Sequence, residues 1–263
     1  MIEPFSRIFP RDGTETMNST LVINAKGGVG KTTIVTNLAS YFASRQITTT
    51  IADCDPQGSS LNWIQQRPTD AFKVYGADLS PRGAPGAPVT RRQIPHDTKQ
   101  LIIDAPAGPS RLLLQDLLAR TQSILIPVAP SAIDVHATAN FIKELLLVGQ
   151  VRFRNIRVAV VANRVRTSRP VYAPLEKFVA SLKISFLTRV SDSDAYVDAA
   201  EKGLGVFEMP ADQCGAEQRE FQPIIQWVQG EEAPVPVPAP VVQEPPSNVV
   251  PLHPPMQQAV TAA

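Results

Sequence analysis

The stretch that decides the fold is INAKGGVGKTT, which occupies residues 23–33. The apolar run Leu21-Val22-Ile23 leads into it and is typical of a buried strand. Apolar residues recur at helical spacing after it: Ile34, Val35, Leu38, Ala39 and Phe42. A strand, a glycine-rich turn and a helix in this order predict a loop that binds phosphate groups.

The residue types in this loop suit a phosphate. Glycines let the backbone turn sharply and point successive N–H groups inward, and the start of the helix adds a partial positive charge. Lys31 would reach phosphate oxygens as a point charge, and the hydroxyl of Thr32 is placed for a magnesium ion. The residues predicted to bind the phosphates are Lys26, Gly27, Gly28, Val29, Gly30, Lys31, Thr32 and Thr33.

The loop departs from the consensus GxxxxGK[ST] at its start. Counting back from Lys31, the first glycine of that pattern falls on Ala25, and Lys26 stands next to it. The resulting KGGVGKTT resembles the deviant Walker A loop of the ParA/MinD family of dimeric ATPases. That resemblance implies ATP and Mg²⁺ as cofactors, and an ATP-dependent homodimer in which Lys26 crosses to the nucleotide of the other subunit.

A second motif, DCDPQGS at residues 53–59, follows a run rich in β-branched residues that predicts a strand. Since ligands bind outside the carboxyl ends of such strands, this turn should face the loop, with one acid reaching the site and the other structural. The motif resembles the first switch of the family. The resemblance implies that Asp55 positions the attacking water, as a catalytic residue beside Lys26 and Lys31, and that Asp53 lies near the magnesium. The switch residues it implies are Pro56, Gln57, Gly58 and Ser59.

A third motif, QLIIDAPAG at residues 100–108, has the Walker B form of an apolar strand that ends in a carboxylate. Asp104 would hold Mg²⁺ through water, because this ion keeps much of its hydration shell. By the same resemblance, Gly108 belongs to the second switch and Asn163, at the end of a later apolar strand, lies against the adenine ring. An asparagine at a strand end is also an ordinary turn residue.

The remaining pattern alternates apolar strands with amphipathic helices, which predicts an α/β fold: one mostly parallel sheet covered by helices on both faces. Further strands are expected at 72–75, 123–128, 157–163 and 184–187, and further helices at 111–120, 132–149, 175–182, 192–201 and 217–228. We expect an N-terminal extension over residues 1–19, the ATPase domain over 20–230, and a disordered, proline-rich tail over 231–263. The tail is interpreted as inert, with a docking segment for a partner as the alternative.

Composition narrows the setting. The chain has 263 residues and a net charge of +1, so nucleic-acid binding requires a local basic patch. Two distant cysteines favour a reducing compartment, and no apolar run has the length of a membrane span. Residues 1–19 do not resemble a secretory signal, and the tail lacks the basic amphipathic helix that MinD uses at membranes. We expect a cytoplasmic, nucleoid-associated protein.

Basic residues gather late in the chain and include Arg164, Arg166, Arg169 and Arg189. They are candidates for non-specific contact with the DNA backbone, while a solvated basic surface is an equally good interpretation of the sequence alone. The family resemblance favours DNA binding.

The function these features predict is that of a partition ATPase, closest to short ParF-like and chromosomal ParA-like proteins. It would hydrolyse ATP weakly and segregate or position a plasmid, chromosome or protein cargo, stimulated by a ParB-like or other adaptor protein. Two alternatives remain: a nucleotide-binding regulator with negligible turnover, and a metabolic relative of the same fold. The chain shows no second catalytic domain and no CxxC pair, which disfavours the metabolic class.

Overall fold

Seven strands form one parallel sheet in the computed structural model, which describes residues 17–80, 94–148, 151, 154–166 and 170–231. Their order across the sheet is β3-β2-β4-β1-β5-β6-β7. The strands are β1 (Asn18–Val22), β2 (Thr49–Asp53), β3 (Val74–Asp78), β4 (Gln100–Asp104), β5 (Ser123–Val128), β6 (Arg157–Val165) and β7 (Ser185–Ser191). β1 is central, with β4 on one side and β5 on the other.

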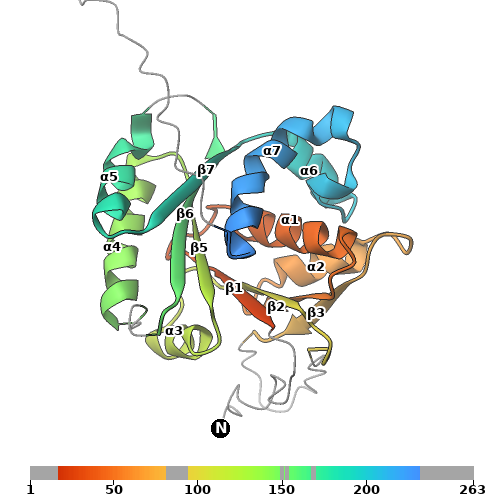
Figure 1. Cartoon of the computed structure of the whole chain (residues 1–263), viewed down its shortest axis with the longest axis horizontal. Helices are drawn as coiled ribbons and strands as arrows, with labels where there is room; N and C mark the ends of the chain where they lie inside the picture. Colours follow the sequence, from red (N-terminus) through yellow and green to blue (C-terminus); the bar gives the residue numbers. More distant parts are fainter. Residues whose placement is uncertain (1–16, 81–93, 149–150, 152–153, 167–169, 232–263) are drawn as a thin grey trace, which may run out of the picture.

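Helices cover both faces of the sheet (Figure 1). One layer contains α3 (Arg111–Leu118), α4 (Ala132–Val148) and α5 (Ala173–Ser181). The other layer contains α1 (Lys31–Ser44), α2 (Ser59–Gln66), α6 (Asp194–Glu201) and α7 (Ala211–Val228). Each layer has its own apolar core against one sheet face, which is why β5 is buried along its whole length and reads as a continuous apolar run.

The predicted α/β architecture is therefore confirmed, with differences at element ends. β1 begins at Asn18, inside the stretch assigned to the N-terminal extension. β7 continues to Ser191, and α7 begins at Ala211 and contains Pro223. The predicted tail over 231–263 lies outside the described residues apart from Glu231.

One helix, α2, was not predicted from the sequence. It has eight residues, of which only Ser60 and Trp63 are buried. An apolar stripe of that size is too short to produce a helical period.

The topology gathers the predicted motifs at one edge. The phosphate loop connects β1 to α1, the DCDPQGS turn follows β2, and Asp104 ends β4. All these strands run parallel, so their carboxyl ends meet at the same edge, where the strand order departs in both directions from β1. This is the place where doubly wound sheets bind ligands.

Candidate nucleotide-binding site

The glycines of the phosphate loop have the backbone geometry that the motif requires. Gly28 has φ 75° and Gly30 φ 84°, in the left-handed region where a side chain is strained. A Cβ at Gly30 would also lie 2.0 Å from Nδ2 of Asn163. Gly30 is the N-cap of α1, so the loop delivers Lys31 and Thr32 to the first turn of that helix. The free N–H groups and the dipole of α1 at this end favour an anion.

Lys31 lies among acids rather than in solvent. Its side chain is buried, and burial lowers the pKa of the ammonium group, while the charges of Asp104 and Asp55 raise it. An ammonium so placed would neutralise phosphate oxygens that enter the loop.

Thr32 and Asp104 form the pair predicted to hold magnesium. The Thr32 hydroxyl donates a hydrogen bond of 3.0 Å to Oδ2 of Asp104. Asp104 is buried, and burial, followed by the nearby charge of Asp53, raises its pKa from 3.8 to about 7. Ionising Asp104 is costly while no cation lies beside it. Its carboxylate and the Thr32 hydroxyl are oxygen ligands of the kind that a divalent cation such as Mg²⁺ prefers.

Asp53 is engaged by its own neighbourhood. It lies beside Asp104 in the parallel register of β2 and β4. Its Oδ2 accepts hydrogen bonds from the Ser60 hydroxyl at 2.7 Å and from the Leu61 N–H at 3.3 Å, and its Oδ1 accepts one from the Asp55 N–H at 2.9 Å. Asp53 therefore orients the start of α2, and the geometry favours Asp104 over Asp53 as the magnesium ligand.

Asp55 is the more accessible of the two acids in the DCDPQGS turn. Its Oδ1 accepts a hydrogen bond of 2.9 Å from the Gln57 N–H, and its carbonyl accepts one from the N–H of Gly58, which has φ 63° and is the N-cap of α2. Gln57, Pro56 and Ser59 are exposed in the same turn. The charge of Asp55 raises the pKa of Lys31, as expected for a turn that faces the loop.

The predicted second switch lies against the start of the loop, at the residue next to Lys26 in the chain. The Lys26 N–H donates to Oδ1 of Asn24, and no hydrogen bond or ion pair of its ammonium group occurs within the described residues. A Cβ at Gly108, which has φ 55°, would lie 3.5 Å from the carbonyl oxygen of Ala25, so the two segments are in contact.

Asn163 and Arg164, at the end of β6, hold the loop from its other side. Nδ2 of Asn163 donates a hydrogen bond of 2.8 Å to the carbonyl of Val29, and Nη1 of Arg164 donates one of 3.2 Å to the carbonyl of Gly28. Asn163 thus has the loop backbone as its partner in this structure, and a contact with adenine stays a prediction.

The arginines predicted to bind DNA are largely paired with acids. Nε of Arg164 and Nε of Arg166 contact the two carboxylate oxygens of Asp192, at 3.3 and 2.5 Å. These contacts lower the pKa of Asp192, the hydrogen bond from Arg166 most strongly. Arg189 pairs with Glu176, and Arg169 lies outside the described residues. The patch therefore carries less net positive charge than the sequence suggests.

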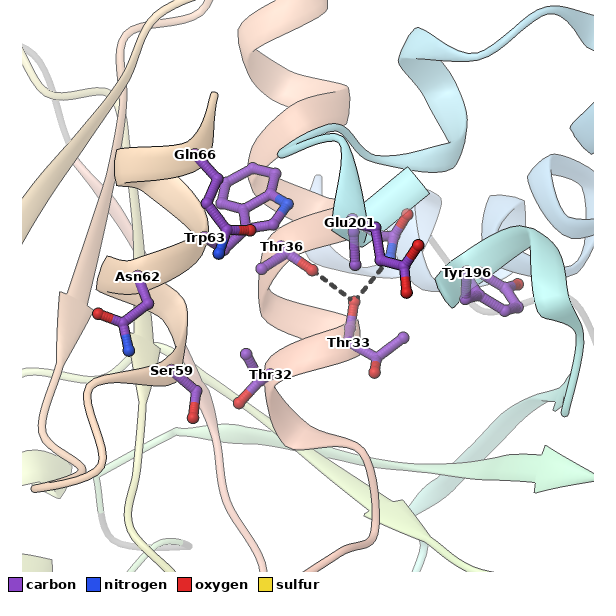
Figure 2. Close-up of a pocket in the computed structure, with 11 residues that line it drawn as sticks. Thr32, Thr33, Thr36, Ser59, Asn62, Trp63, Gln66, Tyr196 and Glu201 are labelled. Atoms are coloured by element: carbon purple, nitrogen blue, oxygen red, sulfur yellow. Dashed lines mark hydrogen bonds between the residues drawn. The ribbon is translucent and has the colours of Figure 1, made fainter. Parts of the chain in front are cut away.

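A cavity of about 320 Å³ opens next to Thr32, between α1, α2 and α6 (Figure 2). The residues that line it are Thr32, Thr33, Thr36, Asn37, Ser59, Asn62, Trp63, Gln66, Tyr196, Ala200 and Glu201. Thr36 and Asn37 both donate to the Thr33 carbonyl. This cavity could not be predicted from the sequence, because α6, from late in the chain, forms it together with α1 and α2.

In the part of the chain that the structure covers, helices with the length and apolar character of a membrane span are absent.

Comparison with known proteins agrees with this geometry. The sequence of residues 20–206 matches the protein family described as "CobQ/CobB/MinD/ParA nucleotide binding domain". Maintenance of carboxysome distribution protein A of Halothiobacillus neapolitanus is 27% identical over 191 residues, which cover 72% of this chain and 87% of that protein. The chromosome-partitioning ATPase Soj of Thermus thermophilus is 29% identical over 147 residues, which cover 46% of this chain and 59% of Soj. A variant of McdA from Cyanothece, solved in complex with ATP, superposes with a TM-score of 0.60 at 13% identity and covers 84% of this chain and 99% of that one.

Proposed function

Because the chain belongs to the CobQ/CobB/MinD/ParA family of nucleotide-binding domains, we propose that it is a partition ATPase that dimerises around ATP to position a cargo. The observation that supports this most directly is the meeting of Lys31, Thr32 and Asp104 at one phosphate loop. The cofactors are ATP and Mg²⁺. The turnover is weak and is stimulated by an adaptor protein of the ParB type or an equivalent cargo protein.

The chain's own residues supply positioning and charge. The loop N–H groups and Lys31 bind the β- and γ-phosphates, and Thr32 and Asp104 are the residues that would hold Mg²⁺. When bound, that ion neutralises charge that develops on the phosphoryl oxygens. Asp55 orients the attacking water and accepts its proton, a role for which its accessible carboxylate at the turn after β2 is suited.

Dimerisation gives Lys26 its role. Its ammonium group has no hydrogen-bond or ion-pair partner in the described part of its own subunit, and Lys31 already serves the phosphates there. We therefore assign Lys26 to the nucleotide of the second subunit, which makes dimerisation and catalysis one event.

The test compares two lysine variants. Lys26→Ala should keep ATP affinity within about threefold of the parent and lose ATP-dependent dimerisation, whereas Lys31→Ala should lose ATP binding itself, at least about 100-fold. Calorimetry measures the affinity for ATP, and light scattering with ATP and Mg²⁺ measures dimerisation. A Lys26→Ala protein that dimerises with ATP as the parent does would contradict the role of Lys26 at the nucleotide of the second subunit.

The cargo assignment follows the relatives. One is described as maintaining carboxysome distribution and another as partitioning chromosomes, so the proposed cargo is a plasmid, a chromosome or a protein assembly. The dimer would be carried on the nucleoid by non-specific DNA binding, and a doubled set of basic residues around Arg166 and Arg189 would offset their pairing with acids. DNA affinity that requires ATP and falls steeply with salt would support this part; ATP-independent or salt-insensitive binding would contradict it.

A regulator with negligible turnover is the second candidate. Its specific support is Asp53, whose two carboxylate oxygens accept hydrogen bonds from Asp55, Ser60 and Leu61 and are therefore held by the protein itself. Phosphate release measured with and without the adaptor protein distinguishes the two functions.

A further inference from the structure

Arg164 has an unusual backbone for its position. Four non-glycine residues in the described part of the chain have a positive φ, and three of them lie in turns beside helices or strands: Gln46, Asn155 and Lys183. Arg164, with φ 57°, lies inside β6, where the register with β7 shifts between Ala162 and Val165. Residues with a side chain rarely adopt this backbone conformation, so its presence within a strand calls for a compensating contact.

That contact is with the phosphate loop. The Arg164 guanidinium bridges two groups: Nη1 donates to the carbonyl of Gly28 and Nε donates to Oδ1 of Asp192. The preceding residue, Asn163, donates to the carbonyl of Val29. Two consecutive side chains of β6 therefore hold two consecutive loop carbonyls on the side of the loop that faces β6.

We propose that Arg164 is a positioning residue for the nucleotide, which acts by fixing the peptide that follows Gly28, and that Asp192 orients its guanidinium. Since a peptide's C=O and N–H point in opposite directions, a carbonyl held toward β6 turns the N–H of that peptide toward the loop interior, where phosphate would bind. The inference rests on the proposed function, because it requires that the loop bind ATP. It moves Arg164 from the predicted DNA surface to the nucleotide site.

Arg166 offers a matched control. It pairs with the same carboxylate of Asp192, it carries the same charge, and its side chain is 76% exposed. Among the described residues, no hydrogen bond joins Arg166 to the loop. A general effect of positive charge near the phosphates would involve both arginines, whereas positioning of the loop involves Arg164 alone.

The experiment measures binding of a non-hydrolysable ATP analogue with Mg²⁺ by calorimetry, without DNA, to the full chain. Arg164→Gly adopts a positive φ without strain, so it removes the guanidinium and keeps the backbone. Arg164→Lys keeps the charge but lacks the planar fork that bridges two acceptors. We expect both variants to bind the analogue about tenfold more weakly than the parent, and Arg166→Ala to bind it within about twofold. Steady-state kinetics should show a raised KM for ATP with kcat within about twofold.

Several outcomes would overturn the inference. If Arg164→Lys binds as the parent does while Arg166→Ala binds more weakly, the effect is one of charge and not of positioning. If Arg164→Gly melts at the parental temperature and binds the analogue with parental affinity, Arg164 has no role at the loop. A parent chain that does not bind the analogue at all would instead refute the proposed function.

Discussion

Replacing Asp104 by Asn should stabilise the nucleotide-free protein at pH 8. Asp104 is buried beside Asp53, and its pKa rises from 3.8 to about 7 as a result. A tenfold change in proton affinity corresponds to about 1.4 kcal/mol, so ionised Asp104 costs the empty fold about 4 kcal/mol. Asn removes the charge and still offers an oxygen to the Thr32 hydroxyl, but its NH₂ group needs a partner, which reduces the gain.

We expect a net gain of about 2 kcal/mol in the free energy of unfolding, which in a domain of this size raises Tm by roughly 4 to 8 °C. The gain has a defined pH dependence. The pKa of Asp104 is higher in the folded protein than in the unfolded chain. Between about pH 4 and pH 7, Asp104 is therefore protonated in the folded protein and ionised in the unfolded chain. The parent therefore gains stability from this group as the pH falls from about 7 to 4, and the difference between Asp104→Asn and the parent should shrink between pH 8 and pH 5.

The assay is thermal unfolding at pH 8 and pH 5, with and without ATP and Mg²⁺. Asp116→Asn is the control, because it makes the same chemical change at an exposed position on α3. In the presence of Mg²⁺ and ATP at about 100 times Kd, the parent should gain about 3 kcal/mol, and Asp104→Asn should lose most of this gain. A variant that is less stable than the parent at pH 8 without nucleotide, or a difference that does not change with pH, would refute the reasoning.

Two further variants test other parts of the site. Asp55→Ala should bind ATP with Mg²⁺ about as tightly as the parent and slow hydrolysis by at least about 100-fold, trapping the dimer; a parental rate of phosphate release would make this acid structural. Gly30→Ala should lose ATP binding and lower Tm, because its Cβ would lie 2.0 Å from Nδ2 of Asn163 at a φ of 84°; the double variant with Asn163→Ala should recover part of the Tm but not the ATP affinity, since the backbone strain remains, and full recovery of both would show that the close contact alone matters.

The phosphate loop and the strand that ends in Asp104 could be predicted because their signals are local. Each is a run of consecutive residues whose order on the chain sets the order of strand, turn and helix. The parallel sheet is predictable for a similar reason, since strands buried on both faces must be apolar throughout. Helix α2 had no such signal, because only two of its side chains, Ser60 and Trp63, are buried. Its start is held by hydrogen bonds that Ser60 and Leu61 donate to Asp53.

The basic patch could not be evaluated from the sequence, because its acids come from other elements. Asp192 follows β7 and Glu176 lies in α5, yet they meet Arg166 and Arg189 in space. A count of charges along the chain shows the arginines as a cluster but does not show that Asp192 and Glu176 lie next to them. For this reason the patch is a weaker indication of DNA binding than the sequence suggests.

The phosphate loop itself shows where local prediction ends. Its sequence determines which groups can bind phosphate, but its shape is held by contacts with residues more than 100 positions away. Asn24 donates to the carbonyl of Pro127 at 2.8 Å and to Thr138 at 3.0 Å, while Asn163 and Arg164 hold the loop's own carbonyls from β6. A loop with many glycines is flexible by itself, so these distant side chains fix the conformation in which its N–H groups face an anion. Variants of the motif should therefore remove a group that binds phosphate or the loop conformation itself, whereas variants of the distant residues that support the loop should weaken ATP binding and leave the chemical step nearly intact.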